Sequence, residues 1–211
     1  MGAGLLARVA ACTLLLSACA TPPSGPGGDA ESEARTTTWR GRFAYAFEAR
    51  DGVEPRRDSG TGGFVLRAVR APQAPRMPPP PVESLSLELY SPLGQTVAAA
   101  SADASGARIQ LADGRRLEAA DPEALTEQAF GWRMPIGRLA DWLDGRSGDG
   151  PAERDPTGRL LRAIDGNWRV TIVEWGDDGP TRIDLDWPVQ PVVPQRTLRL
   201  RLAVEPPARG R

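Results

Sequence analysis

Apolar and polar side chains alternate along most of this chain, which is the pattern of β-strands with one buried face. In the first clear stretch the residues of one parity are Trp39, Gly41, Phe43, Tyr45 and Phe47. Residues 34–40 fit either a helical turn or the start of this strand. The same alternation, bounded by turn residues, predicts further strands at 63–69, 85–89, 96–101, 107–111, 168–175, 181–187 and 197–204. Hairpins at this spacing predict an antiparallel sheet that curls or closes into a barrel.

Two segments between the early and the late strands break the alternation and predict helices. Asp121 is suited to cap the first helix, Pro122 to occupy its first position, and Gly131 to end it. Pro135 begins a second segment, in which apolar residues recur at helical spacing until Gly145. Both helices are amphipathic, so we expect them to plug or cover one face of the sheet.

The N-terminus has the features of a secretory signal. Arg8 precedes a short apolar run at 9–16, which is too short to span a membrane. The sequence Leu16-Ser17-Ala18-Cys19 resembles the bacterial lipobox, in which the cysteine receives a diacylglyceryl group and the signal is cut before it. The resemblance implies a signal peptide at 1–18 and lipid attachment at Cys19. Position 20 is Ala rather than Asp, the usual inner-membrane retention signal of enteric bacteria, which favours the outer membrane.

The rest of the 211 residues is long enough for one sizeable core, and we expect a single domain at 35–205. Residues 19–34 are rich in Pro, Gly and Ser and predict a flexible tether. The insert APQAPRMPPPP at 71–81 predicts an exposed loop, because proline cannot donate to a sheet ladder. A ligand for a partner domain is the less favoured interpretation of this insert. Residues 206–211 are expected to form a short tail.

Composition removes most catalytic chemistries. The chain has no His, its 26 basic residues are all Arg, and its two cysteines, Cys12 and Cys19, lie at the N-terminus. The mature domain therefore lacks the groups for Ser-His-Asp, Cys-His and Ser-Lys sites, Schiff bases, Walker phosphate loops and His- or Cys-ligated zinc. The net charge of −1 gives no reason to expect nucleic acid as a partner. We expect no cofactor and no metal.

Carboxylates are the remaining candidates for chemistry, since two of them suffice for glycoside hydrolysis. Most of the notable ones, however, lie beside glycine in turn sequences, where aspartate bonds nearby backbone: Asp51, Asp113, Asp165, Asp177 and Asp178. Asp184 and Asp186 alternate with apolar residues and are expected to face solvent. An acid pair for catalysis is therefore disfavoured.

The segment Ser91-Pro92-Leu93-Gly94 predicts a type I turn, with proline at its second and glycine at its fourth position. This turn places Leu93 at the tip of a hairpin, where side chains are normally polar. From the residues alone, Leu93 is as well explained by folding back onto the core as by protruding from it.

Several segments resemble, in order, the LolB family of outer-membrane lipoprotein receptors. The most specific is LELYSPLGQT at 87–96, which resembles the family's strand and protruding loop. The others are Trp39–Phe43, the helical segment 131–145, Gly166–Val170 and Pro180–Ile183. Three features depart from the family pattern: the insert at 71–81, the absence of a frequent Trp near Phe64 and Leu66, and an end at Glu205-Pro206-Pro207 without a terminal aromatic residue.

The resemblance implies a mainly β fold with a few helices: a half-open antiparallel β-barrel that encloses an apolar cavity under short α-helices. It implies a non-enzymatic receptor, anchored in the outer membrane and facing the periplasm. Such a receptor accepts acylated lipoproteins from the periplasmic carrier LolA and inserts them among outer-membrane phospholipids. It also implies that Pro92, Leu93 and Gly94 form a membrane-insertion loop. We expect a monomer.

Alternation offers nine candidates for the inward wall of that cavity, although each fits a packed core equally well: Leu85, Leu87, Leu89, Trp168, Ile183, Leu185, Leu198, Leu200 and Leu202. The main alternative function is a structural or envelope-binding lipoprotein whose barrel is filled. A hydrolase that uses carboxylates is a further alternative, which would need buried acids that converge.

Overall fold

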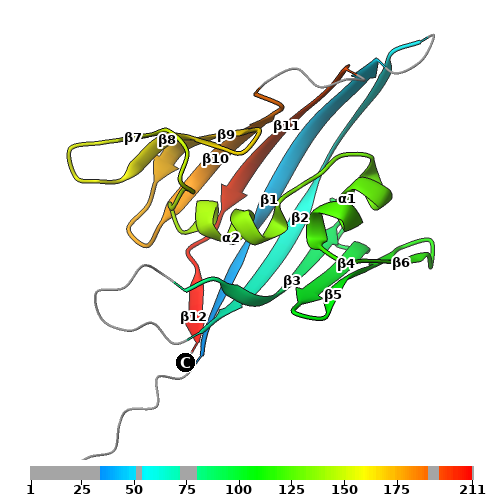
Figure 1. The fold of residues 1–211 in the computed structure, drawn as a ribbon, viewed down its shortest axis with the longest axis horizontal. Helices are drawn as coiled ribbons and strands as arrows, with labels where there is room; N and C mark the ends of the chain where they lie inside the picture. Colours follow the sequence, from blue (N-terminus) through cyan, green and yellow to red (C-terminus); the bar gives the residue numbers. More distant parts are fainter. Residues whose placement is uncertain (1–33, 51–53, 72–79, 190–194, 211) are drawn as a thin grey trace, which may run out of the picture. The chain divides into compact units, whose positions relative to one another are not determined.

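The computed structural model describes residues 34–50, 54–71, 80–189 and 195–210. The expected signal peptide, Cys19, all but the last residue of the expected tether and most of the Pro-rich insert lie outside these residues. The described part contains two helices and twelve strands (Figure 1). The first five strands are β1 Arg35–Arg50, β2 Arg56–Arg70, β3 Val82–Tyr90, β4 Thr96–Asp103 and β5 Gly106–Leu111. The others are β6 Arg116–Ala119, β7 Ala152–Arg154, β8 Leu160–Asp165, β9 Trp168–Trp175, β10 Pro180–Trp187, β11 Gln195–Val204 and β12 Ala208–Gly210.

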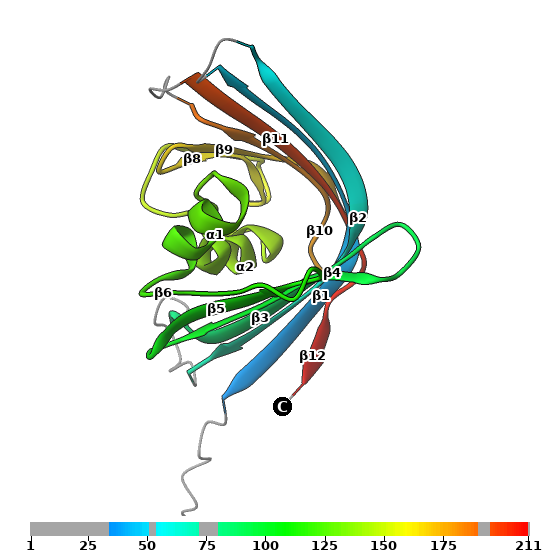
Figure 2. The same ribbon diagram turned by 90° about the vertical axis from the view of Figure 1, so that its right-hand side faces the viewer.

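The strands form one antiparallel sheet in the order β6-β5-β4-β3-β2-β1-β11-β10-β9-β8-β7, with β12 paired to the start of β1. The end strands β6 and β7 are not paired with each other, so the sheet is half-open. It curves around the two helices, which lie on its concave side (Figure 2). The predicted fold class is therefore confirmed.

The first strand begins earlier in the chain than the first clear apolar stretch. β1 starts at Arg35, so residues 34–40 lead into a strand and do not form a helical turn. Trp39 is fully buried and Phe47 nearly so, and both belong to the predicted inward parity. β2 is also longer than the predicted strand at 63–69, because its first residues pair with the end of β1.

Four strands were not predicted, and each lacks a strong pattern. β6 and β7 are short edge strands whose residues are mostly exposed and charged. β8 buries only Leu160 and Ala163. β12 occupies 208–210 in the expected tail, where its backbone pairs with Thr36, Thr37 and Thr38. Backbone pairing forms these strands, whose apolar residues are too few to give a clear alternation.

The helices begin and end where the sequence predicts. In α1, Pro122–Phe130, the Asp121 carboxylate accepts a hydrogen bond of 2.8 Å from the Ala124 backbone N–H, and Gly131 ends the helix at φ 83°. α2, Ile136–Leu143, follows Pro135 directly. None of the described helices is long and apolar enough to cross a bilayer.

Gly60 and Gly62 explain how aromatic rings fit over the curved inner face of β2. They lie opposite Tyr45 and Phe43 on β1, and all four belong to the inward parity. A Cβ atom on Gly62 would lie 2.8 Å from Cζ of Phe43 and 2.2 Å from the Tyr90 carbonyl oxygen. Glycines of this kind let a sheet bend sharply while neighbouring rings cover the exposed backbone.

Candidate functional site

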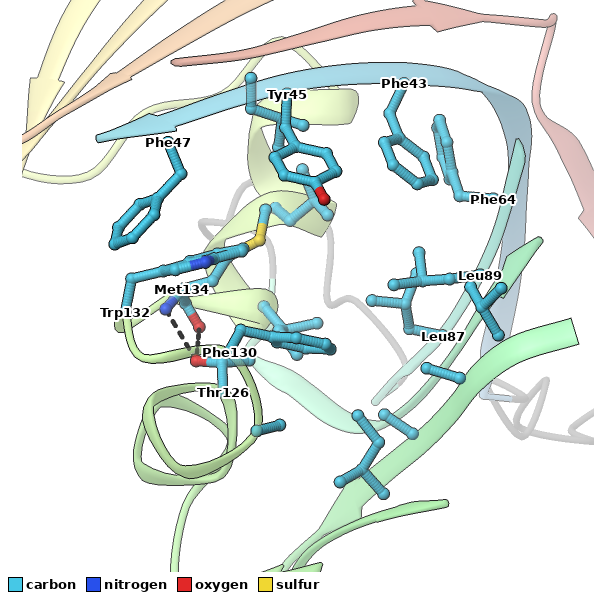
Figure 3. A pocket seen from close by; sticks show the side chains of 18 of the residues that line it. Phe43, Tyr45, Phe47, Phe64, Leu87, Leu89, Thr126, Phe130, Trp132 and Met134 are labelled. Carbon is cyan, nitrogen blue, oxygen red and sulfur yellow. Dashed lines mark hydrogen bonds between the residues drawn. The ribbon is translucent and has the colours of Figure 1, made fainter. Parts of the chain in front are cut away.

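A cavity of about 660 Å³ lies between the helices and the concave face of the sheet. Aromatic side chains from β1, β2, the end of α1 and the segment just after it form much of its wall (Figure 3): Phe43, Tyr45, Phe47, Phe64, Phe130 and Trp132. Aliphatic side chains form most of the rest: Leu87, Leu89, Ile109, Ile136, Leu139, Leu200 and Leu202. Its lining is therefore predominantly apolar.

Small residues leave this volume vacant. Ala98 and Ala100 line the cavity from β4, and Ala129 lines it from α1. Ala98 and Ala100 are buried, so they occupy inward positions at which a larger side chain would reach into the cavity.

The charged residues of the cavity lining lie together at the start of β2. Arg56, Arg57 and Asp58 line the cavity and are exposed, so they mark its opening. The Tyr45 hydroxyl donates to the Asp58 carboxylate over 3.1 Å, and burial together with this bond raises the pKa of Tyr45. The Arg56 guanidinium lies 5.5 Å from the centre of the Phe47 ring. One side of the cavity is thus polar, and the remainder can hold only apolar groups without a desolvation cost.

A buried hydroxyl connects α1 to the segment that leads into α2. Thr126 Oγ1 accepts a hydrogen bond of 2.8 Å from the Met134 N–H (Figure 3). It also donates a hydrogen bond of 2.9 Å to the Glu123 carbonyl. From β11, Arg196 Nη1 donates a hydrogen bond of 2.9 Å to the Gly131 carbonyl. These bonds hold the lid helix α1 by its C-terminal half.

α2 is held more firmly than α1, because its charged residues pair with residues of β8 on one side and of β2 on the other. Asp165 accepts hydrogen bonds from Arg138 Nη2 (2.9 Å), Trp142 Nε1 (2.9 Å) and the Gly148 N–H (3.2 Å). Burial alone would raise the pKa of Asp165, but the bonds from Arg138 and Trp142 outweigh it and lower that pKa. Asp165 therefore anchors α2 to β8, a role that its turn sequence does not reveal.

A second ionic contact joins α2 to β2. The Asp141 carboxylate lies 2.8 Å from Arg70 Nη2 and 2.9 Å from Arg146 Nη2. Arg146 also pairs with Asp144 at 2.7 Å. The side chains of Arg70, Asp141 and Asp144 are at least four-fifths buried, so these pairs are weakly screened by solvent.

The structure divides the nine cavity candidates into two groups. Leu87, Leu89, Leu200 and Leu202 line the cavity. The other five are buried but are not among its lining residues: Leu85, Trp168, Ile183, Leu185 and Leu198. They pack in the core, where Trp168 contacts Trp142 of α2 with ring centres 5.9 Å apart. Alternation identified the inward face correctly, but it did not identify the aromatic rings of β1 and α1 as cavity wall.

The segment Ser91–Gly94 forms the expected turn. The Gly94 N–H donates to the Ser91 carbonyl over 2.9 Å, and Gly94 adopts φ 81°. Leu93 is 88% exposed at the tip, which decides against its folding back onto the core. The structure therefore presents a large apolar side chain on a short, hydrogen-bonded projection.

Three of the remaining carboxylates, Asp113, Asp184 and Asp186, lie close to arginine side chains. Asp113 accepts from the Arg115 N–H at 3.0 Å, as its turn predicts. Asp184 and Asp186 are partly exposed and lie near Arg201 and Arg199 on the neighbouring strand. Among the described residues, no cluster of three or more His, Cys, Asp or Glu side chains suited to a metal ion occurs.

Comparisons with known proteins agree on one family. The family described as "Outer membrane lipoprotein LolB" matches residues 82–206. The outer-membrane lipoprotein LolB of Cupriavidus necator is 34% identical over 178 residues, covering 82% of this chain and 82% of that protein. Its namesakes are 31% identical in Ralstonia nicotianae (88% of this chain, 87% of that protein) and 32% identical in Bordetella petrii (92% and 88%).

One solved structure offers no further argument. The crystal structure of MucB in complex with MucA(peri) aligns over 80% of this chain and 89% of that chain. The sequence identity is 12% and the TM-score is 0.13, which is too low to bear on the fold.

Proposed function

The chain belongs to the LolB family of outer-membrane lipoproteins, and from this premise we propose that it is a receptor for lipoproteins. It accepts them from a soluble periplasmic carrier, LolA, by taking their acyl chains into the cavity under α1 and α2. It then releases them into the inner leaflet of the outer membrane. No covalent step is required, because each transfer moves an acyl chain from one apolar environment to another.

The apolar cavity is the observation that carries this proposal. Its volume of about 660 Å³ lies within the range of roughly 300–1,000 Å³ found for ligand pockets. A long acyl chain costs on the order of 10 kcal/mol to expose to water, at about 0.8 kcal/mol per methylene. A protein that carries such a chain must therefore offer an apolar space, and one with a polar opening such as Arg56 and Arg57 leaves room for the lipid's polar end.

The receptor must itself stay at the membrane, and we propose Cys19 as its anchor. Cys19→Ser should abolish lipid attachment and leave an uncleaved or soluble form. Intact-mass measurement and membrane fractionation check this, and acylation elsewhere in the wild type contradicts it.

A change of cavity volume tests acyl-chain binding. Leu89→Trp places a larger side chain in the cavity wall, and we expect it to weaken the binding of a dansyl-labelled fatty acid. The measurement uses the soluble polypeptide 20–211, which has no lipid of its own and keeps the compact unit Ser32–Arg211 whole. Leu117→Trp is the matched control, because Leu117 of β6 packs against the core but does not line the cavity.

Two results separate the proposal from the alternative of a structural lipoprotein with a filled barrel. Loss of binding in Leu89→Trp, with normal binding and melting temperature in Leu117→Trp, supports a receptor. Failure of the unaltered protein to bind the probe, or equal binding by both variants, supports the filled barrel.

A further inference from the structure

A second depression, of about 680 Å³, lies outside the barrel under the hairpin loop that carries Leu93. Ser91, Pro92 and Gly94 form one side of this groove. Its floor consists of small residues on the convex face of the sheet: Ala44, Thr61, Gly63 and Ala203. The convex face and the protruding loop therefore enclose a space distinct from the acyl-chain cavity, although Phe43 and Leu202 border both.

Three arginines meet over this floor. In the sheet register, Arg42 of β1 and Arg182 of β10 both lie opposite Ala203 of β11, one on each side, and Arg201 is two residues away on β11. All three are exposed and line the groove. Neighbouring strands thus bring three positive charges to one place, although the residues are far apart in the sequence.

Negative charge does not neutralise this cluster. Asp184 is the one acidic residue among those that line the groove, and its carboxylate lies 3.8 Å from Arg201 Nε. Arg182 lies 3.9 Å from Glu174 at the side. Among the described residues Arg42 has no ion pair. Exposed ion pairs of this kind contribute little to stability, so the guanidinium groups can bind another anion instead.

We propose that this groove binds the phosphate of an anionic phospholipid of the bilayer while Leu93 enters the hydrocarbon. Arginine forks suit phosphate oxygens, which they contact by paired hydrogen bonds. Two exposed apolar side chains belong to this surface: Val173, 54% exposed, lines the groove, and Leu93, 88% exposed, is carried by the loop that forms one side of it. A free phosphate ion offers nothing to these apolar groups, whereas a phospholipid at a bilayer surface presents a phosphate and hydrocarbon together.

This inference rests on the proposed receptor function, because it assigns the headgroup side of the same membrane contact. The loop alone offers one leucine, which gives weak and unoriented attachment. Arginines on β1, β10 and β11 add contacts on the convex face, so the loop and the sheet approach the bilayer together. The convex face would then be the side of the barrel that meets the membrane.

Vesicle flotation tests the proposal with the soluble polypeptide 20–211. We expect tighter binding to vesicles of phosphatidylcholine with phosphatidylglycerol than to phosphatidylcholine alone. Each of Arg42→Gln, Arg182→Gln and Arg201→Gln should reduce this preference roughly five-fold, the effect of about 1 kcal/mol per arginine at an anionic surface. Asp184→Asn should raise it by a similar factor, with an unchanged melting temperature as evidence that the variant is folded.

Arg169→Gln is the matched control, since Arg169 is an exposed arginine of β9 outside the groove. If it weakens binding as much as the groove variants, binding reflects general charge, and the site is refuted. Equal binding of the groove variants and the unaltered protein also refutes it. Fatty-acid binding is measured in parallel: a groove variant that retains it while losing the lipid preference supports the groove, and loss of both refutes an effect specific to the groove. Absence of fatty-acid binding in the unaltered protein contradicts the proposed function instead.

Discussion

The concave face of the sheet has the same inward alternation on both sides of β1, yet its two halves are filled differently. Over β8–β10, α2 and large side chains fill the space, and Trp142, Leu160, Ile183 and Leu185 have no measurable exposure. Over β1–β5, small residues such as Ala98 and Ala100 leave the cavity. The comparison teaches that alternation determines which face is inside, whereas side-chain volume determines whether the inside is packed or hollow.

The largest effect on stability is expected in the packed half. Trp142→Ala should lower the free energy of unfolding by about 3–5 kcal/mol, because it removes a fully buried ring and its bond to Asp165. Denaturant unfolding measures this loss. A change of less than 1 kcal/mol, on the order of a single methylene, would show that α2 is not packed as the comparison requires.

The anchor of α2 should have the next largest effect, and it should depend on pH. Asp165→Asn should cost about 1–3 kcal/mol at neutral pH, because charged hydrogen bonds to Arg138 and Trp142 are weakened. The lowered pKa of Asp165 means that its ionised form stabilises the fold above the ordinary carboxyl value. That contribution is lost as the pH falls through the lowered pKa, so wild type and variant should converge in acid. A pH-independent difference contradicts this.

One substitution made in both halves tests the comparison directly. Ala163 of β8 is buried and does not line the cavity, so Ala163→Leu should destabilise by about 1–3 kcal/mol through overpacking. Ala100→Leu projects into the cavity and should change stability by less, while it weakens fatty-acid binding. Denaturant unfolding and fatty-acid binding are measured on both variants. Equal destabilisation by the two substitutions would contradict the distinction between a packed half and a hollow half.

The smallest change in stability is expected at the loop tip. Leu93→Glu should alter the free energy of unfolding by no more than about 0.5 kcal/mol, because the side chain is exposed. The variant should still accept lipoprotein from LolA, since Leu93 does not line the cavity. It should fail to release cargo into liposomes, because a charge resists entry into hydrocarbon. Normal release would show that insertion is driven from elsewhere, and loss of cargo binding would place Leu93 in the cavity function.

Much of the fold was predictable, because its long strands and both helices carry strong periodic patterns. Leu87, Leu89, Leu200 and Leu202 were also correctly assigned to the inward face, and they line the cavity. The division between cavity and packed core was not predictable from parity, since Leu198 and Leu200 share a face and differ in surroundings. The signal that was present lay in the small residues, such as Ala98 and Ala100, at inward positions.

Other parts depended on contacts that a linear pattern does not contain. The turn at Ser91–Gly94 was readable, but whether Leu93 protrudes depends on how the hairpin is placed on the sheet. Asp165 gave a turn signal because glycine follows it, while its partners Arg138 and Trp142 lie more than twenty residues away. The strand β12 is formed by backbone pairing and has little apolar character, so it could be recognised only from its pairing with β1 in the structure.

The order of the strands also bears on how the protein folds during export. β1 to β6 form one local meander and β7 to β11 another, and in the described residues the two are joined where Gly41–Arg50 of β1 pairs with Gln195–Val204 of β11. Pairing of segments so far apart requires closure of a very large loop, which slows folding. A chain that crosses the inner membrane from its N-terminus cannot complete this seam until nearly all of it has emerged. The β1 edge of the first meander therefore stays unpaired in the periplasm until β11, the last long strand, has emerged.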